Sequence, residues 1–193
     1  MTMRKSIMAA VAAATLLLTA GCGISANKDA TPDAGSRHNE ADVAFAEMMI
    51  PHHEQAIEMS KLAATRAESR EVKELASAIE AAQGPEIETM QGWLESWDED
   101  GTSHEMSHDE MPGMVDEKTM GELGKATGTE FDRLFLTSMI AHHEGAIAMA
   151  ESEKSDGVHE GSLRLADAII KTQTAESSGW KTCSASSASP GDY

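Results

Sequence analysis

Two segments of this chain, ninety residues apart, carry the same pair of adjacent histidines in the same local sequence. Residues 49–54 (MIPHHE) return as residues 139–144 (MIAHHE). Seventeen of the 47 positions in 40–86 are identical to their counterparts in 130–176, against about 3 expected from ordinary residue usage. A repeat of this length requires that both copies form the same supersecondary unit, so it constrains the fold more than any local signal.

Each copy has the periodicity of amphipathic helices. At about one hundred degrees per residue, one face of the first segment collects Asp42, Phe45, Met49, His52, His53, Ala56 and Met59. The second copy repeats this face ninety residues later. A second apolar stripe runs from about residue 70 to 97, and its counterpart from about 158 to 180. The pattern therefore predicts two consecutive helical hairpins.

Two such hairpins can bury their apolar stripes only against each other. The sequence therefore predicts an all-α fold, a four-helix bundle with approximate twofold symmetry. We expect the first helix of each hairpin to begin near Asn39 and Thr129. Each is a good N-cap, and an acid follows three residues later, Asp42 or Asp132, in the manner of a capping box.

The first 21 residues have the features of an export signal. Arg4 and Lys5 precede a short apolar run, which ends in Ala-Gly-Cys22. This ending resembles a bacterial lipobox, so we expect cleavage before Cys22, acylation of its thiol, and a protein attached to the outer face of the cell membrane. An ordinary secretory peptide with a cysteine at its cleavage site is the alternative. Both predict export.

Changes in composition divide the remaining chain. Cys183 would have no intramolecular partner if Cys22 is lipidated, so no disulfide framework is expected. The predicted segments are a flexible tether 22–38, a first hairpin 39–97, a linker 98–128, a second hairpin 129–182 and a disordered tail 183–193, with 39–182 forming one bundle domain.

The chain without its first 21 residues is strongly acidic. It retains 13 basic and 33 acidic side chains, a net charge of −20 with histidine neutral. Nucleic acid and anionic lipid surfaces would repel such a chain, so contact with the membrane is expected only through the lipid anchor. A metal cation is the partner that the charge favours, although the charge also fits simple solubility.

The paired histidines and nearby methionines predict a metal site in the bundle. Buried imidazoles are unfavourable unless they find partners, and coordination would provide them. Met49 lies three and four residues before the histidines, so it can share a site with either. Adjacent histidines diverge around the helix, so we expect one of each pair to meet its repeat mate across the symmetry axis. Imidazole with thioether favours copper, especially Cu(I).

Two further groups of residues extend this prediction. Four side chains on the partner helices are candidates to orient the imidazoles: Gln83, Glu86, Gln173 and Glu176. The linker is unusually rich in His and Met, and it could capture copper or be a solvated acidic connection. Its candidate ligands are His104, Met106, His108, Met111 and Met114.

Catalysis is not required by any motif in the sequence. Ferritin-like di-iron oxidases need Glu-x-x-His pairs on two helices, and the one such pair here, Glu105 and His108, lies in the linker. We therefore expect a metal-binding protein that is not an enzyme. Two alternatives stay open: an interaction module, whose His/Met faces contact an envelope protein or a second copy in a homodimer, and a copper- or iron-dependent redox enzyme.

The doubled Phe-x₃-Met-Ile-x-His-His-Glu-x-Ala-Ile-x-Met pattern resembles the bacterial domain-of-unknown-function 305 family over about residues 39–180. The resemblance implies a ferritin-like helical bundle in an exported protein, and copper binding in some members. Carried over by position, the implied ligands are Met49, His52, His53, Met59, Met139, His142, His143 and Met149. For Met59 and Met149 the residues alone allow packing equally well. Gly145, opposite Gln55, departs from the repeat.

Overall fold

The computed structural model describes residues 37–99 and 111–187, with side chains as far as Trp180. Within these residues the chain is all-α, as predicted, and five helices are present. They are α1 (Glu40–Arg66), α2 (Arg70–Trp97), α3 (Glu117–Leu123), α4 (Gly128–Asp156) and α5 (Glu160–Ser187). In the described segments no helix is long and apolar enough to cross a membrane.

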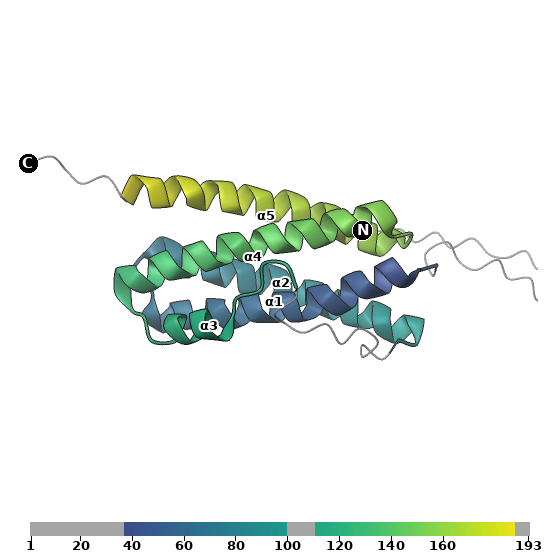
Figure 1. The fold of residues 1–193 in the computed structure, drawn as a ribbon, viewed down its shortest axis with the longest axis horizontal. Coiled ribbons are helices and arrows are strands. Elements are labelled where there is room, and N and C mark those ends of the chain that lie inside the picture. Colours follow the sequence, from purple (N-terminus) through teal and green to yellow (C-terminus); the bar gives the residue numbers. More distant parts are fainter. Residues whose placement is uncertain (1–36, 100–110, 188–193) are drawn as a thin grey trace, which may run out of the picture. The chain divides into compact units, whose positions relative to one another are not determined.

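The four long helices form a bundle of two hairpins (Figure 1). Helix α2 packs on α1, α5 packs on α4, and the two hairpins meet mainly through α1 and α4. These two central helices run antiparallel. The start of α1 lies beside the end of α4, where Asn39 donates a hydrogen bond from Nδ2 to the carbonyl of Asp156 (2.8 Å). The short helix α3 packs beside α1 and α4.

The first helix begins as predicted. Asn39 caps α1 and accepts hydrogen bonds from the amides of Ala41 and Asp42, while the Asp42 carboxylate accepts from the amide of Asn39 (2.7 Å). The prediction of Thr129 as an N-cap was wrong: α4 begins at Gly128, and its N-cap is Thr127, two residues earlier, which makes no side-chain capping bond. Gly128 enters that helix at φ 65°, a conformation that favours glycine.

Asp132 does not complete a capping box because its carboxylate serves the other hairpin. It accepts hydrogen bonds from the amides of Glu68 and Ser69, in the turn between α1 and α2 (3.2 and 2.8 Å). Asp42 does the same for the turn between α4 and α5 at Val158 and His159 (3.1 and 2.9 Å). Each hairpin therefore holds the turn of the other in place, and the twofold symmetry extends to both ends of the bundle.

The last helix differs from its predicted bounds. Helix α5 begins at Glu160 and continues to Ser187, five residues into the segment 183–193 that the sequence analysis assigned to a disordered tail. That segment has neither proline nor glycine before Pro190, so nothing in it breaks a helix that is already formed.

Candidate metal site

The paired histidines lie at the centre of the contact between α1 and α4. All four imidazoles are fully buried. The rings of His52 and His142 lie against each other across the pseudo-twofold axis, with centroids 3.7 Å apart and planes inclined by 37°. The expectation that one histidine of each pair meets its repeat mate is confirmed.

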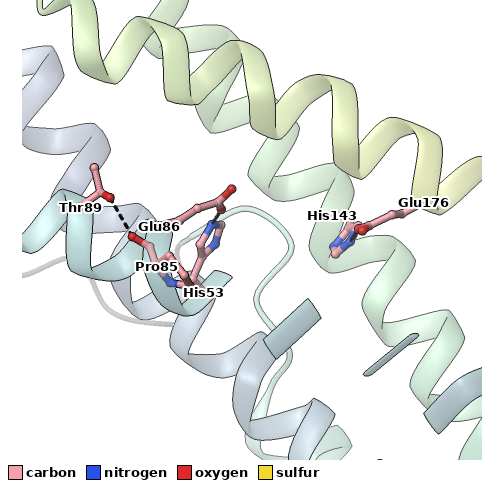
Figure 2. Close-up of polar contacts among 6 residues, drawn as sticks. All are labelled: His53, Pro85, Glu86, Thr89, His143 and Glu176. Atoms are coloured by element: carbon pink, nitrogen blue, oxygen red, sulfur yellow. Dashed lines mark hydrogen bonds and ion pairs between the residues drawn. The ribbon is translucent and has the colours of Figure 1, made fainter. Parts of the chain in front are cut away.

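The second histidine of each pair bonds instead within its own hairpin. His53 Nε2 lies 2.7 Å from a carboxylate oxygen of Glu86, and His143 Nε2 lies 2.7 Å from that of Glu176. Figure 2 shows the two equivalent pairs, each joining the central helix of a hairpin to its outer helix. A carboxylate bound to one imidazole nitrogen fixes the ring and makes the other nitrogen a better metal ligand.

These contacts determine which nitrogen of each neutral ring carries the proton. A carboxylate or a backbone carbonyl only accepts, so Nε2 is the donor in His53 and His143, and also in His52, whose Nε2 lies 3.0 Å from the carbonyl of Pro112. The lone pair of each ring is then on Nδ1. Among the described residues, these Nδ1 atoms and both nitrogens of His142 are buried with no hydrogen-bond partner. The site thus presents unpartnered imidazole nitrogens to its interior.

Burial keeps the two central imidazoles uncharged. Desolvation lowers the pKa of His52 to about 3. The hydrogen bond to Pro112 has a smaller effect that raises this pKa, and the neighbouring His53 has a smaller effect that lowers it. The pKa of His142 is held well below its usual range, first by desolvation and then by the neighbouring His52. Only the neutral imidazole has a lone pair to give a metal, so both rings are in the ligating form at neutral pH.

The four methionines lie in two buried clusters of the core. Met49 and Met149 belong to one cluster, and Met59 and Met139 belong to the other. Because α1 and α4 are antiparallel, each cluster combines a methionine that precedes one histidine pair with one that follows the other pair. Thioether sulfur therefore stands on both sides of the histidine layer along the bundle.

A short segment, residues 111–115, begins with a turn from Met111 to Met114, lies against His52 and breaks the twofold symmetry. Besides the contact of Pro112 with His52, the side chain of Gln55 donates to the carbonyl of Val115 and accepts from its amide (both 2.8 Å). On the facing helix, a Cβ on Gly145 would lie 2.0 Å from the carbonyl oxygen of Pro112. The unmatched pair Gln55 and Gly145 is thus explained: one residue binds the segment, and the other leaves room for it.

Replacement of Gly145 by alanine should displace this segment. The added methyl group would overlap backbone atoms that cannot move without breaking the contacts of Gln55 and His52, so we expect a loss of about 1–3 kcal/mol in the free energy of unfolding. Chemical denaturation of Gly145→Ala would measure it. Gly179→Ala on α5 is the matched control, since a Cβ there meets nothing within 4 Å. Equal stability of the two variants would contradict this account.

Other predicted site residues lie in different surroundings. Gln83 and Gln173 are buried on α2 and α5, but their Oε1 atoms have no hydrogen-bond partner in the part of the chain that the structure describes. Within the segment 111–115, Met111 is buried and Met114 is half-buried. His104, Met106 and His108 lie outside the described residues, as does Cys22. Among the described residues no three His, Cys, Asp or Glu side chains converge to hold a metal ion, so a site here needs methionine as well.

Sequence reasoning did not find Trp180 or Pro112 as neighbours of the histidines. The indole of Trp180 packs on the ring of His143, with centroids 4.8 Å apart, where the repeat has Met90. The sequence did hold a signal for Trp180, because its counterpart in the repeat, Met90, lies on the apolar stripe of its helix. It held no signal for the contact of Pro112 with His52, because every residue has a backbone carbonyl.

A family model described as "Domain of unknown function (DUF305)" matches residues 42–183. A DUF305 protein from Streptomyces coelicolor, assigned to the secreted proteins, is 30% identical, with 79% of this chain and 98% of that chain covered and a TM-score of 0.72. A DUF305 fragment from Deinococcus radiodurans is 28% identical, covering 75% and 95%, with a TM-score of 0.69.

A third similar structure is CopM in its Cu(I)-bound form. It is 32% identical, with 77% of this chain and 98% of that chain covered and a TM-score of 0.65. CopM structures with bound Ag and with bound Cu(II) also match. No curated protein matches the sequence significantly. The family model spans most of the chain and the fold agrees with these structures, so this chain belongs to the DUF305 family.

Proposed function

We propose that this protein binds copper, as Cu(I), through the methionines and histidines between α1 and α4, and that it buffers, stores or delivers the ion outside the cytoplasm. The observation that carries the proposal is the layer of four buried imidazoles, each of which has at least one nitrogen with no hydrogen-bond partner among the described residues. Burying such groups without partners is unfavourable by about 1–3 kcal/mol each, and a bound ion would remove that penalty.

The chemistry of the donors favours Cu(I) over other ions. Neutral imidazole and thioether are soft or borderline ligands, and they suit Cu(I) much better than Mg²⁺ or Ca²⁺. The buried methionines on both sides of the histidine layer are uncharged, so a monovalent ion avoids burying a higher charge. The copper-bound and silver-bound forms of CopM support the same class of ion.

The proposal is one of binding without turnover. The imidazoles are fully buried, so a substrate other than the ion has no access to them in this conformation. Export and a lipid anchor on Cys22 complete the proposal: the acidic domain would attract cations at the outer face of the membrane, with the His/Met linker as a first point of capture.

Competition for Cu(I) against a chromogenic chelator tests this function. We would use residues 23–193 with Cys183→Ser, which removes both thiols and leaves α5 whole to Ser187. The test variant replaces His52, His53, His142 and His143 with alanine. We expect the parent to bind Cu(I) tightly and stoichiometrically, and the variant to lose at least 100-fold in affinity, equivalent to about 2.7 kcal/mol.

The control replaces a buried histidine remote from the layer, His159→Ala, and it should bind Cu(I) as the parent does. Circular dichroism would verify that each variant is helical. Equal Cu(I) affinity in the parent and the quadruple variant would contradict the proposed copper site between α1 and α4. No tight binding in either would favour the interaction module.

A further inference from the structure

A small cavity lies between α2 and α5, on the side of the bundle away from the α1–α4 contact. Its volume is about 10 Å³, about the room that one water molecule occupies. Its eight lining residues are four repeat-related pairs, among them Gln83 with Gln173 and Glu86 with Glu176. A cavity lined by such pairs lies on the pseudo-twofold axis, which also passes between His52 and His142.

Four of the lining residues, Gln83, Glu86, Gln173 and Glu176, carry side-chain oxygens that can bind a cation. Glu86 and Glu176 use one carboxylate oxygen, Oε2, for the histidine contact. The other oxygen makes no hydrogen bond within the described part of the chain. Gln83 and Gln173 are each only 3% exposed, and the Oε1 atom of each is buried without a partner in residues 37–99 and 111–180. Two carboxylates and two unpartnered amide oxygens thus surround one small space.

We propose that this cavity binds a divalent hard cation of the Ca²⁺ or Mn²⁺ type through Gln83, Glu86, Gln173 and Glu176. Carbonyl and carboxylate oxygens are the ligands such ions prefer, and four protein oxygens, with waters on the side of the cavity that faces solvent, make six-coordination. Two negative charges balance a divalent ion, and the buried amide oxygens gain the partners that they lack.

The cavity can be reached from solvent. The side chains of Glu86 and Glu176 are 25% and 24% exposed, so an ion can arrive from solvent without a change in the bundle. Because the site has oxygen ligands only, it does not rest on the copper proposal: it takes the opposite class of ion, and either site can fail without the other.

Isothermal titration calorimetry tests the proposal. Residues 23–193 with Cys183→Ser, treated with a chelator to remove all metal, are titrated with Ca²⁺ and, separately, with Mn²⁺. At about 0.15 M KCl, which screens diffuse attraction to the acidic surface, we expect one ion per chain with a Kd of about 0.1–1 mM. The decisive variant is Gln83→Leu with Gln173→Leu, which leaves the net charge unchanged. Its affinity should fall at least tenfold. The matched control is Gln91→Leu, an exposed glutamine on α2, which should bind as the parent does.

A second variant, Glu86→Gln with Glu176→Gln, keeps an acceptor for each histidine but removes both charges, and it should also lose the ion. If the leucine variant does not fold, the result with this glutamine variant tests the proposal. The proposal is overturned if neither ion binds the parent at millimolar concentration, or if both cavity variants bind as tightly as Gln91→Leu does. The second result would mean that the acidic surface holds the ions.

Discussion

Replacing His142 with leucine (His142→Leu) is expected to stabilise the metal-free protein while it weakens Cu(I) binding. Both nitrogens of His142 are buried and have no partner in the described segments, and an unsatisfied buried polar group costs about 1–3 kcal/mol. Leucine fills a similar volume without that penalty. We therefore expect the free energy of unfolding without metal to rise by about 1–2 kcal/mol, after allowing for the lost packing against His52.

With Cu(I) present the order should reverse. A ligand at 100 to 1,000 times its Kd adds about 3–4 kcal/mol to the stability of the native state, and His142→Leu should lose most of this gain. Denaturant unfolding with and without Cu(I) measures both effects. His159→Leu is the control: His159 is buried, but its Nδ1 accepts from the amide of Ser162 (3.2 Å), so it should destabilise the metal-free protein. A metal-free His142→Leu variant less stable than the parent would show that packing outweighs the penalty.

The second large effect concerns the pH dependence of stability at the end of the bundle where α1, α4 and α5 meet. Ser162 Oγ lies 2.5 Å from Glu153 Oε1 and 2.8 Å from Asp42 Oδ1. One hydroxyl hydrogen cannot serve both oxygens, so a second proton must sit on one carboxyl group. Burial, with Asp42 nearby, raises the pKa of Glu153 to about 8, which makes Glu153 the protonated partner.

The charge on Asp42 is stabilised in the same cluster. Burial by itself would raise the pKa of Asp42, but hydrogen bonds from the amide of His159 and from Glu153 hold it below its ordinary value. Its contribution to stability is therefore present above pH 3.8 and is lost as the pH falls further. The other facing charge is Asp156, which disfavours ionisation of Glu153.

The sign of the Glu153 effect follows from proton binding. Between its ordinary pKa of 4.5 and about 8, the folded protein keeps a proton that the unfolded chain has released. Stability therefore falls as pH rises through that range and levels off above it. The difference amounts to about 3–5 kcal/mol by pH 8. Glu153→Gln, which keeps a donor but cannot ionise, should flatten the slope and be the more stable protein at pH 8.

Urea unfolding at several values between pH 4.5 and 8.5 would measure the slope. Glu151→Gln removes an exposed carboxyl two residues away and should leave the pH dependence as it is in the parent. If the stability of Glu153→Gln and that of Glu151→Gln depend on pH with the same slope, Glu153 is ionised in the folded protein. That result would contradict the assignment of the proton to Glu153.

Much of this architecture could be predicted because its causes are local or periodic. The ninety-residue repeat required two equivalent hairpins, and the spacing of apolar residues placed each histidine pair on the buried face of its helix. The capping box of Asn39 and Asp42 is a contact over three residues, so it could be read directly from the sequence. The same reading failed for Asp132, because its partners, Glu68 and Ser69, lie more than sixty residues away.

What the sequence alone determined is therefore the fold class and the set of donors: two hairpins, one bundle, and histidine and methionine on its central faces. Only the tertiary structure decided how those donors are partnered. Two adjacent histidines diverge around a helix, and periodicity cannot say which one faces the axis. The packing of α1 on α4 brought His52 to His142 and left His53 to Glu86. The contact of His52 with the carbonyl of Pro112 also depends on the tertiary structure. Every residue has a backbone carbonyl, so the sequence cannot indicate which one will lie beside the imidazole.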